Sequence, residues 1–142
     1  RLRHIPVEPE ILRQTISKEI HGIISTTGIS RKHTGYDYIY YMIFLLIFKY
    51  SCQKIQINEL YNDVKKQYGK NIAAIERSTR SAIVSGWEKM KTADKQMLFK
   101  NCLYSGTKPT NTVYINTIAS YIRHLYNDPL ELYYKSKDNK DT

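Results

Sequence analysis

Glu76, Arg77 and Arg80 recur at a spacing that places their side chains along one side of an α-helix. An arginine guanidinium pairs bidentately with O6 and N7 of guanine, and a glutamate carboxylate accepts from the N4 amino group of cytosine. Ala73 and Ala74 come just before them, and such small side chains let a helix backbone approach a groove closely. The segment therefore predicts a face that reads DNA bases. The alternative is a solvated face on which Glu76 and Arg80 form an i,i+4 ion pair, and this segment alone leaves both interpretations open.

Basic residues surround this face and predict contacts to DNA phosphates. Residues 65–91 contain seven Lys and Arg against two Asp and Glu, so their net charge is +5. In a helix-turn-helix, the first helix crosses the phosphate backbone and the second enters the major groove. We expect phosphate contacts from side chains before and beside the reading face: Lys66, Lys70, Asn71 and Ser81.

The elements that must position these residues are two helices, predicted over 57–68 and 72–89. Apolar residues recur at three- and four-residue steps in both segments, as in Leu60, Tyr61 and Val64 of the first. Gly69 follows the first pattern directly, and a glycine just past a helix is a common C-terminal stop. Two helices joined by a short turn with a glycine have the layout of a helix-turn-helix.

The rest of the chain also reads as helices, which predicts a compact all-α bundle of about six helices. Further helices are expected from Pro9 to before Gly28, over 36–50, from Thr92 to about Phe99, and from Thr110 or Asn111 through Tyr126. Residues 100–110 read as an irregular connection, and Asn127-Asp128-Pro129 as a break. We therefore expect one domain over 1–130, followed by a polar, disordered tail over 131–142.

Composition supports a globular domain with a polyanionic partner. The chain has 142 residues, 42% of them hydrophobic, and a net charge of +9, which argues against a disordered chain or a disulfide-rich mini-protein. A compact domain this basic is typical of proteins that bind nucleic acid, although excess lysine also improves solubility.

Several classes are disfavoured by what the sequence lacks. It has no Gly-rich phosphate loop, no Ser/His/Asp arrangement and no metal-ligand spacing, so we expect no enzyme, no cofactor and no metal site. Cys52 and Cys102 are isolated, which fits a reducing, cytoplasmic compartment. The first ten residues have no apolar run that would predict a signal peptide, and the apolar segment 36–50 is shorter than the roughly twenty residues of a membrane span.

Three islands in the sequence resemble one known family. The first is Gly28-Ile29 followed by Gly35-Tyr36-x-Tyr38, and the last is Lys108-Pro109-Thr110-Asn111. Between them, Leu60-Tyr61 precedes the run Ile75-Glu76-Arg77-x-x-Arg80-x-Ala82-Ile83 with Trp87. From about Ile11 to Leu125 the chain resembles the C-terminal DNA-binding effector domain of the stage-zero sporulation response regulator of endospore-forming bacteria.

The resemblance implies roles for matching residues. Glu76, Arg77 and Arg80 would face the major groove, and Lys108, Thr110 and Asn111 would meet phosphates where the last helix begins, unless the latter two only cap that helix. It also implies a contact between residues 88–99 and the RNA polymerase sigma subunit, together with self-association on tandem DNA sites. Ala74 stands where the family has an arginine and Ser81 where it has a histidine, which predicts an altered target sequence.

The sequence as a whole therefore predicts a regulator of transcription that binds double-stranded DNA sequence-specifically, with helix 72–89 in the major groove. Two alternatives remain open from the residues: a protein-interaction domain of the same fold that has lost DNA readout, and a non-specific nucleic-acid-binding module. The changes at 74 and 81, with Val84 where the family has an acidic residue, leave the first alternative open, although the retained Arg77 and Arg80 argue against it. The positive charge and the 13 tyrosines support the second.

Overall fold

A computed structural model describes residues 8–141, with side-chain surroundings through Asp138. Residues 1–7 and 142 lie outside the described part. Most of the first ten residues, for which no signal peptide was expected, therefore also lie outside it. The described residues form eight α-helices and no β-strand, which confirms the predicted all-α class but not the count of about six. The helices are α1 (Pro9–Thr26), α2 (Tyr36–Phe48), α3 (Ile57–Tyr68), α4 (Ile72–Lys89), α5 (Thr92–Leu98), α6 (Lys100–Ser105), α7 (Asn111–Leu125) and α8 (Asn127–Asp141).

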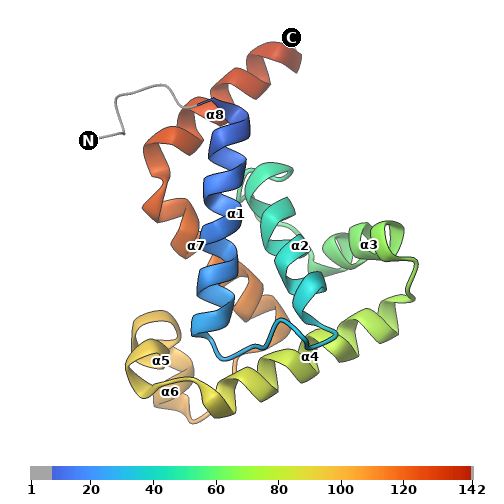
Figure 1. Ribbon diagram of the computed structural model, residues 1–142, viewed down its shortest axis with the longest axis vertical. Coiled ribbons are helices and arrows are strands. Elements are labelled where there is room, and N and C mark those ends of the chain that lie inside the picture. Colours follow the sequence, from blue (N-terminus) through green and yellow to red (C-terminus); the bar gives the residue numbers. More distant parts are fainter. Residues whose placement is uncertain (1–7, 142) are drawn as a thin grey trace.

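The core is built around α2, which packs against α1, α3, α4 and α7 (Figure 1). Nearly every residue of this helix is apolar or aromatic. A helix that is apolar on all sides must be buried, and the neighbouring helices cover most of its circumference. Helices α1, α3, α4 and α7 each contribute one apolar stripe, such as Ile16, Ile20 and Ile24 of α1, all fully buried. Burial of these stripes, and not helix propensity, supplies most of the stability of such short helices.

A tight turn joins α3 to α4. Gly69 ends α3 in the left-handed conformation, with φ 69°, and its N–H donates to the Lys65 carbonyl. Asn71 then begins α4, because its Oδ1 accepts from the Ala74 N–H at 2.8 Å. The predicted bounds of both helices, 57–68 and 72–89, are confirmed.

The loop between α1 and α2 runs along α4, with both of its ends against the α4 backbone (Figure 1). A Cβ atom added at Gly28 would lie 2.4 Å from the Gly86 carbonyl oxygen, and one added at Gly35 would lie 2.2 Å from the Ser78 carbonyl oxygen. Gly28 also has a φ of +86°, which side-chain-bearing residues rarely adopt. Both ends of this loop are therefore held against the α4 backbone at positions that require glycine.

Two expectations about the second half of the chain are wrong. Residues 100–105 are helical as α6 and are ended by Gly106 in the left-handed conformation, so 100–110 is not wholly irregular. The chain also does not stop at Asn127-Asp128-Pro129 but continues as α8 through Asp141. Pro129 is the third residue of α8, and proline is tolerated in the first helical turn, where the backbone N–H has no intrahelical acceptor.

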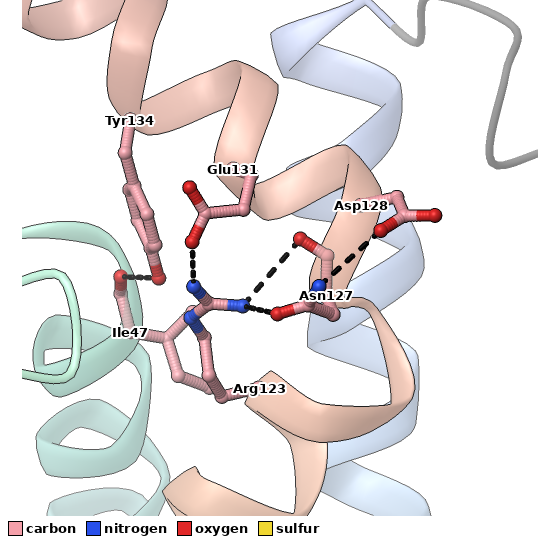
Figure 2. Close-up of polar contacts among 6 residues, drawn as sticks. All are labelled: Ile47, Arg123, Asn127, Asp128, Glu131 and Tyr134. Atoms are coloured by element: carbon pink, nitrogen blue, oxygen red, sulfur yellow. Dashed lines mark hydrogen bonds and ion pairs between the residues drawn. The ribbon is translucent and has the colours of Figure 1, made fainter.

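Helix α8 is attached to the body of the protein by apolar and polar contacts. Leu130 is fully buried, and the Tyr134 hydroxyl donates to the Ile47 carbonyl at 2.8 Å. Figure 2 shows Arg123 between Glu131, with which it forms an ion pair, and Asn127, whose Oδ1 accepts at 2.7 Å. Lys137 donates to the Phe48 carbonyl at the end of α2, at 3.3 Å. The predicted disordered tail is thus replaced, as far as Asp141, by a helix that packs on the core.

Across the described residues, none of the helices has both the length and the apolar character needed to cross a bilayer. The same residues contain no group of three or more His, Cys, Asp and Glu side chains placed to hold a metal ion. Cys52 and Cys102 are half-buried free thiols.

Candidate nucleic-acid interface

Helix α4 has one buried side and one exposed side. Ile75, Thr79 and Ala82 are buried against the core, whereas Ala73, Arg77 and Ser81 are exposed on the opposite side. This division follows from the 3.6-residue period of the helix, because positions four apart share a face. The exposed side holds a surface hollow lined by Glu76, Arg77, Arg80, Ser81, Val84 and Ser85. The structure therefore brings Glu76, Arg77 and Arg80 together, as predicted.

The three polar residues of this face differ in exposure and in their hydrogen bonds within the protein. Arg77 and Glu76 are exposed. Arg80 is half-buried, and its Nη1 donates to the Pro109 carbonyl at 2.5 Å. A guanidinium has five N–H donors, so this bond fixes the Arg80 side chain and leaves other donors available. Among the described residues Glu76 and Arg80 form no ion pair with each other, which is the contact that the solvated-face alternative requires.

The residues before α4 that were expected to contact phosphates are exposed, and one of them also has a structural role. Lys66 and Lys70 are exposed at the end of α3 and in the turn. The Asn71 side chain is exposed too, but its oxygen already accepts from Ala74, so it acts first as a helix cap. Ala74 itself is half-buried and presents only a methyl group.

The start of α7 lies beside α4 but presents fewer side chains than expected. Thr110 caps α7, since its Oγ1 accepts from the Val113 N–H at 3.1 Å. Lys108 is partly exposed and pairs with Glu88 at 3.0 Å, and this hydrogen bond lowers the pKa of the Glu88 carboxyl. Both residues remain at the surface, next to the Arg80 guanidinium that is bound to Pro109.

Asn111 is the exception, and its expected phosphate contact does not fit the structure. The side chain is only 8% exposed, and its Nδ2 donates to the Tyr61 hydroxyl at 3.1 Å and to the Glu76 carbonyl at 3.2 Å. These bonds join α7 to α3 and α4. Asn111 therefore fixes the position of α7 beside α4 instead of facing an anion.

The opposite flank of α4 is covered by the loop between α1 and α2. His33 Nδ1 accepts from the Gly35 N–H at 3.0 Å, and its Nε2 lies 3.4 Å from the Ser81 hydroxyl. Arg31 and Lys32 are exposed in the same loop. Sequence reasoning did not select these residues, although a run of Arg, Lys and His between Gly28 and Gly35 was visible.

Comparison with known proteins gives one family. Residues 20–122 match the family described as sporulation initiation factor Spo0A C terminal. The match includes the exposed face of α4, its two flanks and the start of α7, and it ends before α8. No curated protein matches the chain. Because the match covers well over half of its residues, the chain belongs to the family of C-terminal, DNA-binding effector domains of the sporulation initiation factor Spo0A.

Proposed function

We propose that this domain is a sequence-specific regulator of transcription that binds double-stranded DNA through a helix-turn-helix formed by α3 and α4. The observation that carries the proposal is the exposed face of α4, on which Arg77 stands free between two flanking elements. The tight turn at Gly69 to Asn71 supports it, because a recognition helix must be held rigidly by the helix before it.

Base reading is assigned to the exposed face of α4. Arg77 reaches outward without a described partner in the protein, and a bidentate pair with guanine is the commonest specific contact that an arginine makes in the major groove. The exposed Glu76 would accept from cytosine, and the small Ala73 would allow close approach at the first turn. Arg80, tied to Pro109, contributes its remaining donors from a fixed position.

Phosphate binding is assigned to the ends of the neighbouring helices. Lys66 and Lys70 would meet the backbone near the start of α4, and Lys108 with Thr110 and the first N–H groups of α7 would meet it along one flank. Asn71 and Ser81 would approach phosphates from α4 itself. Asn111 is left out of this set because its side chain is buried.

Two further partners are proposed only from the family likeness. The end of α4 and α5, where Met97 is 56% exposed, would contact the RNA polymerase sigma subunit. Two copies would associate on tandem DNA sites. The competing functions, an interaction domain without DNA readout and a non-specific nucleic-acid binder, predict no preferred sequence.

Selection of bound duplexes from a random DNA pool at near-physiological salt tests the proposal. We expect the parent protein to enrich one motif, and Arg77→Ala to lose discrimination at one base pair by about 1–3 kcal/mol. Lys135→Ala, an exposed change in α8, is the matched control and should leave the motif intact. A folded parent that enriches no motif, or an Arg77→Ala variant with unchanged preference, would contradict the assignment.

A further inference from the structure

The loop from Gly28 to Gly35 follows α4 along one flank of the proposed reading face. Its two glycines lie against the backbone of Gly86 and Ser78, which are eight residues apart on α4, so the loop runs antiparallel to that helix for about two turns. Substitution at either contact would force the backbones apart. The loop is therefore held in one position relative to α4.

Hydrogen bonds inside the loop fix its shape further. The His33 N–H donates to the Ser30 carbonyl at 3.0 Å, and the Lys32 N–H donates to the Ser30 hydroxyl at 3.2 Å. His33 then links the loop to α4 through Ser81 at 3.4 Å. A loop bonded in this way presents its side chains with little loss of conformational entropy when a partner binds.

The side chains that this loop presents are positively charged. Arg31 and Lys32 are exposed, and among the described residues neither forms an ion pair. The Arg31 guanidinium lies 5.4 Å from the centre of the Tyr36 ring, which restricts the orientation of its side chain. Two cations without a carboxylate partner on a fixed loop are suited to a polyanion.

A helix in the major groove has a phosphate strand on each side, because the groove is about as wide as the helix with its side chains. One side of α4 meets the start of α7, through Arg80 and Pro109. The other side meets the α1–α2 loop, through Ser81 and His33. The phosphate contacts assigned above at α7 occupy only the first side.

We propose that Arg31 and Lys32 bind the phosphates of the second DNA strand, so that α4 is clamped between two anion-binding flanks. This inference rests on the proposed function, since it requires α4 to enter the groove. It adds a phosphate-binding element upstream of the helix-turn-helix, at residues 31 and 32. Because both contacts are to the backbone, they would contribute affinity without sequence preference.

The test is the dependence of affinity on salt for the selected duplex and for a scrambled duplex. The logarithm of the binding constant falls linearly with the logarithm of the salt concentration, and each lost phosphate contact reduces the magnitude of this slope by about 1. The double variant Arg31→Ala/Lys32→Ala should therefore reduce the magnitude by about 2. Lys32→Ala alone, which leaves the Tyr36 contact intact, should lower it by about 1. Lys135→Ala, with the same loss of charge on α8, should leave the slope unchanged.

The possible results separate the two proposals. A shallower salt dependence in the loop variants, with an unchanged selected motif, supports phosphate binding by Arg31 and Lys32. An unchanged slope in both loop variants overturns it, while a motif that still depends on Arg77 leaves the proposed function standing. A parent protein that prefers no sequence overturns the proposed function and this inference together.

Discussion

Two polar side chains at this surface, Arg80 and Asn111, differ in whether they keep donors available for a partner. Both are polar residues beside the start of α7, yet one keeps donors at the surface and the other is buried. The Asn111 amide bonds a hydroxyl on α3 and a carbonyl on α4. Buried polar groups are costly unless they are bonded, so removal of this amide would take a hydrogen bond from two helices at once, α3 and α4.

His21 carries a prediction about pH at the same scale. Its Nδ1 lies 2.7 Å from the Tyr36 hydroxyl, and its ring stacks on Tyr40 with centres 4.2 Å apart. Burial, and secondarily the charge of Arg31, lowers the pKa of His21 in the folded state. Below the unfolded pKa of about 6.5, the unfolded chain therefore binds more protons at this site, and stability falls as pH falls.

We expect His21→Gln to show a shallower loss of melting temperature than the parent between pH 7.5 and pH 5.5. The glutamine does not titrate, so the part of the slope that comes from this position disappears. Thermal unfolding followed by circular dichroism measures it. His124→Gln, at an exposed position of α7, is the matched control. Equal slopes for His21→Gln and the parent would show that His21 protonation is not linked to folding.

At the scale of elements, the α1–α2 loop depends on close backbone contact with α4. Gly35→Ala would place a methyl group 2.2 Å from the Ser78 carbonyl oxygen, and we expect it to destabilise the fold by about 1–3 kcal/mol. Gly22→Ala, in α1 where no atom lies within 4 Å of the added group, should instead stabilise by about 0.5–1 kcal/mol. Urea unfolding of the two variants compares them directly. A Gly35→Ala variant as stable as the parent or more stable would show that the loop does not lie tightly against α4.

The same elements show what local sequence patterns predict and what they miss. The apolar stripes and Gly69 were sufficient for the bounds of α3 and α4, because helix ends depend on neighbouring residues. Leu130, Tyr133 and Tyr134 also recur at helical spacing, but Pro129 was interpreted as a break when it lies in a first turn. Burial of Asn111 could not be foreseen, since it arises from Tyr61, fifty residues earlier in the chain. The loop flank was missed for a similar reason, because only the folded chain brings His33 beside Ser81.

At the scale of the whole molecule, the proposed DNA-binding helix α4 and the C-terminal helix α8 lie at opposite ends (Figure 1). Helix α4 runs along one end of the protein, and α8 lies at the other end, against α1 and the end of α7 (Figure 1). The family match stops at residue 122, so α8 and its contacts are an addition to the matched part. Its attachment through Leu130, Tyr134 and Lys137 contributes to the shared core without reaching the interface.

This separation predicts that damage to α8 lowers stability and leaves DNA binding by the folded protein unchanged. Leu130 is fully buried, so Leu130→Ala should cost about 2–5 kcal/mol of unfolding free energy. Leu132 is 48% exposed on the same helix, and Leu132→Ala should change stability by no more than about 0.5 kcal/mol. Urea unfolding gives both values, and titration of DNA against the folded fraction gives the affinities. If Leu130→Ala weakens binding per folded molecule while Leu132→Ala does not, α8 is coupled to α4 through the core, and the two ends are not independent.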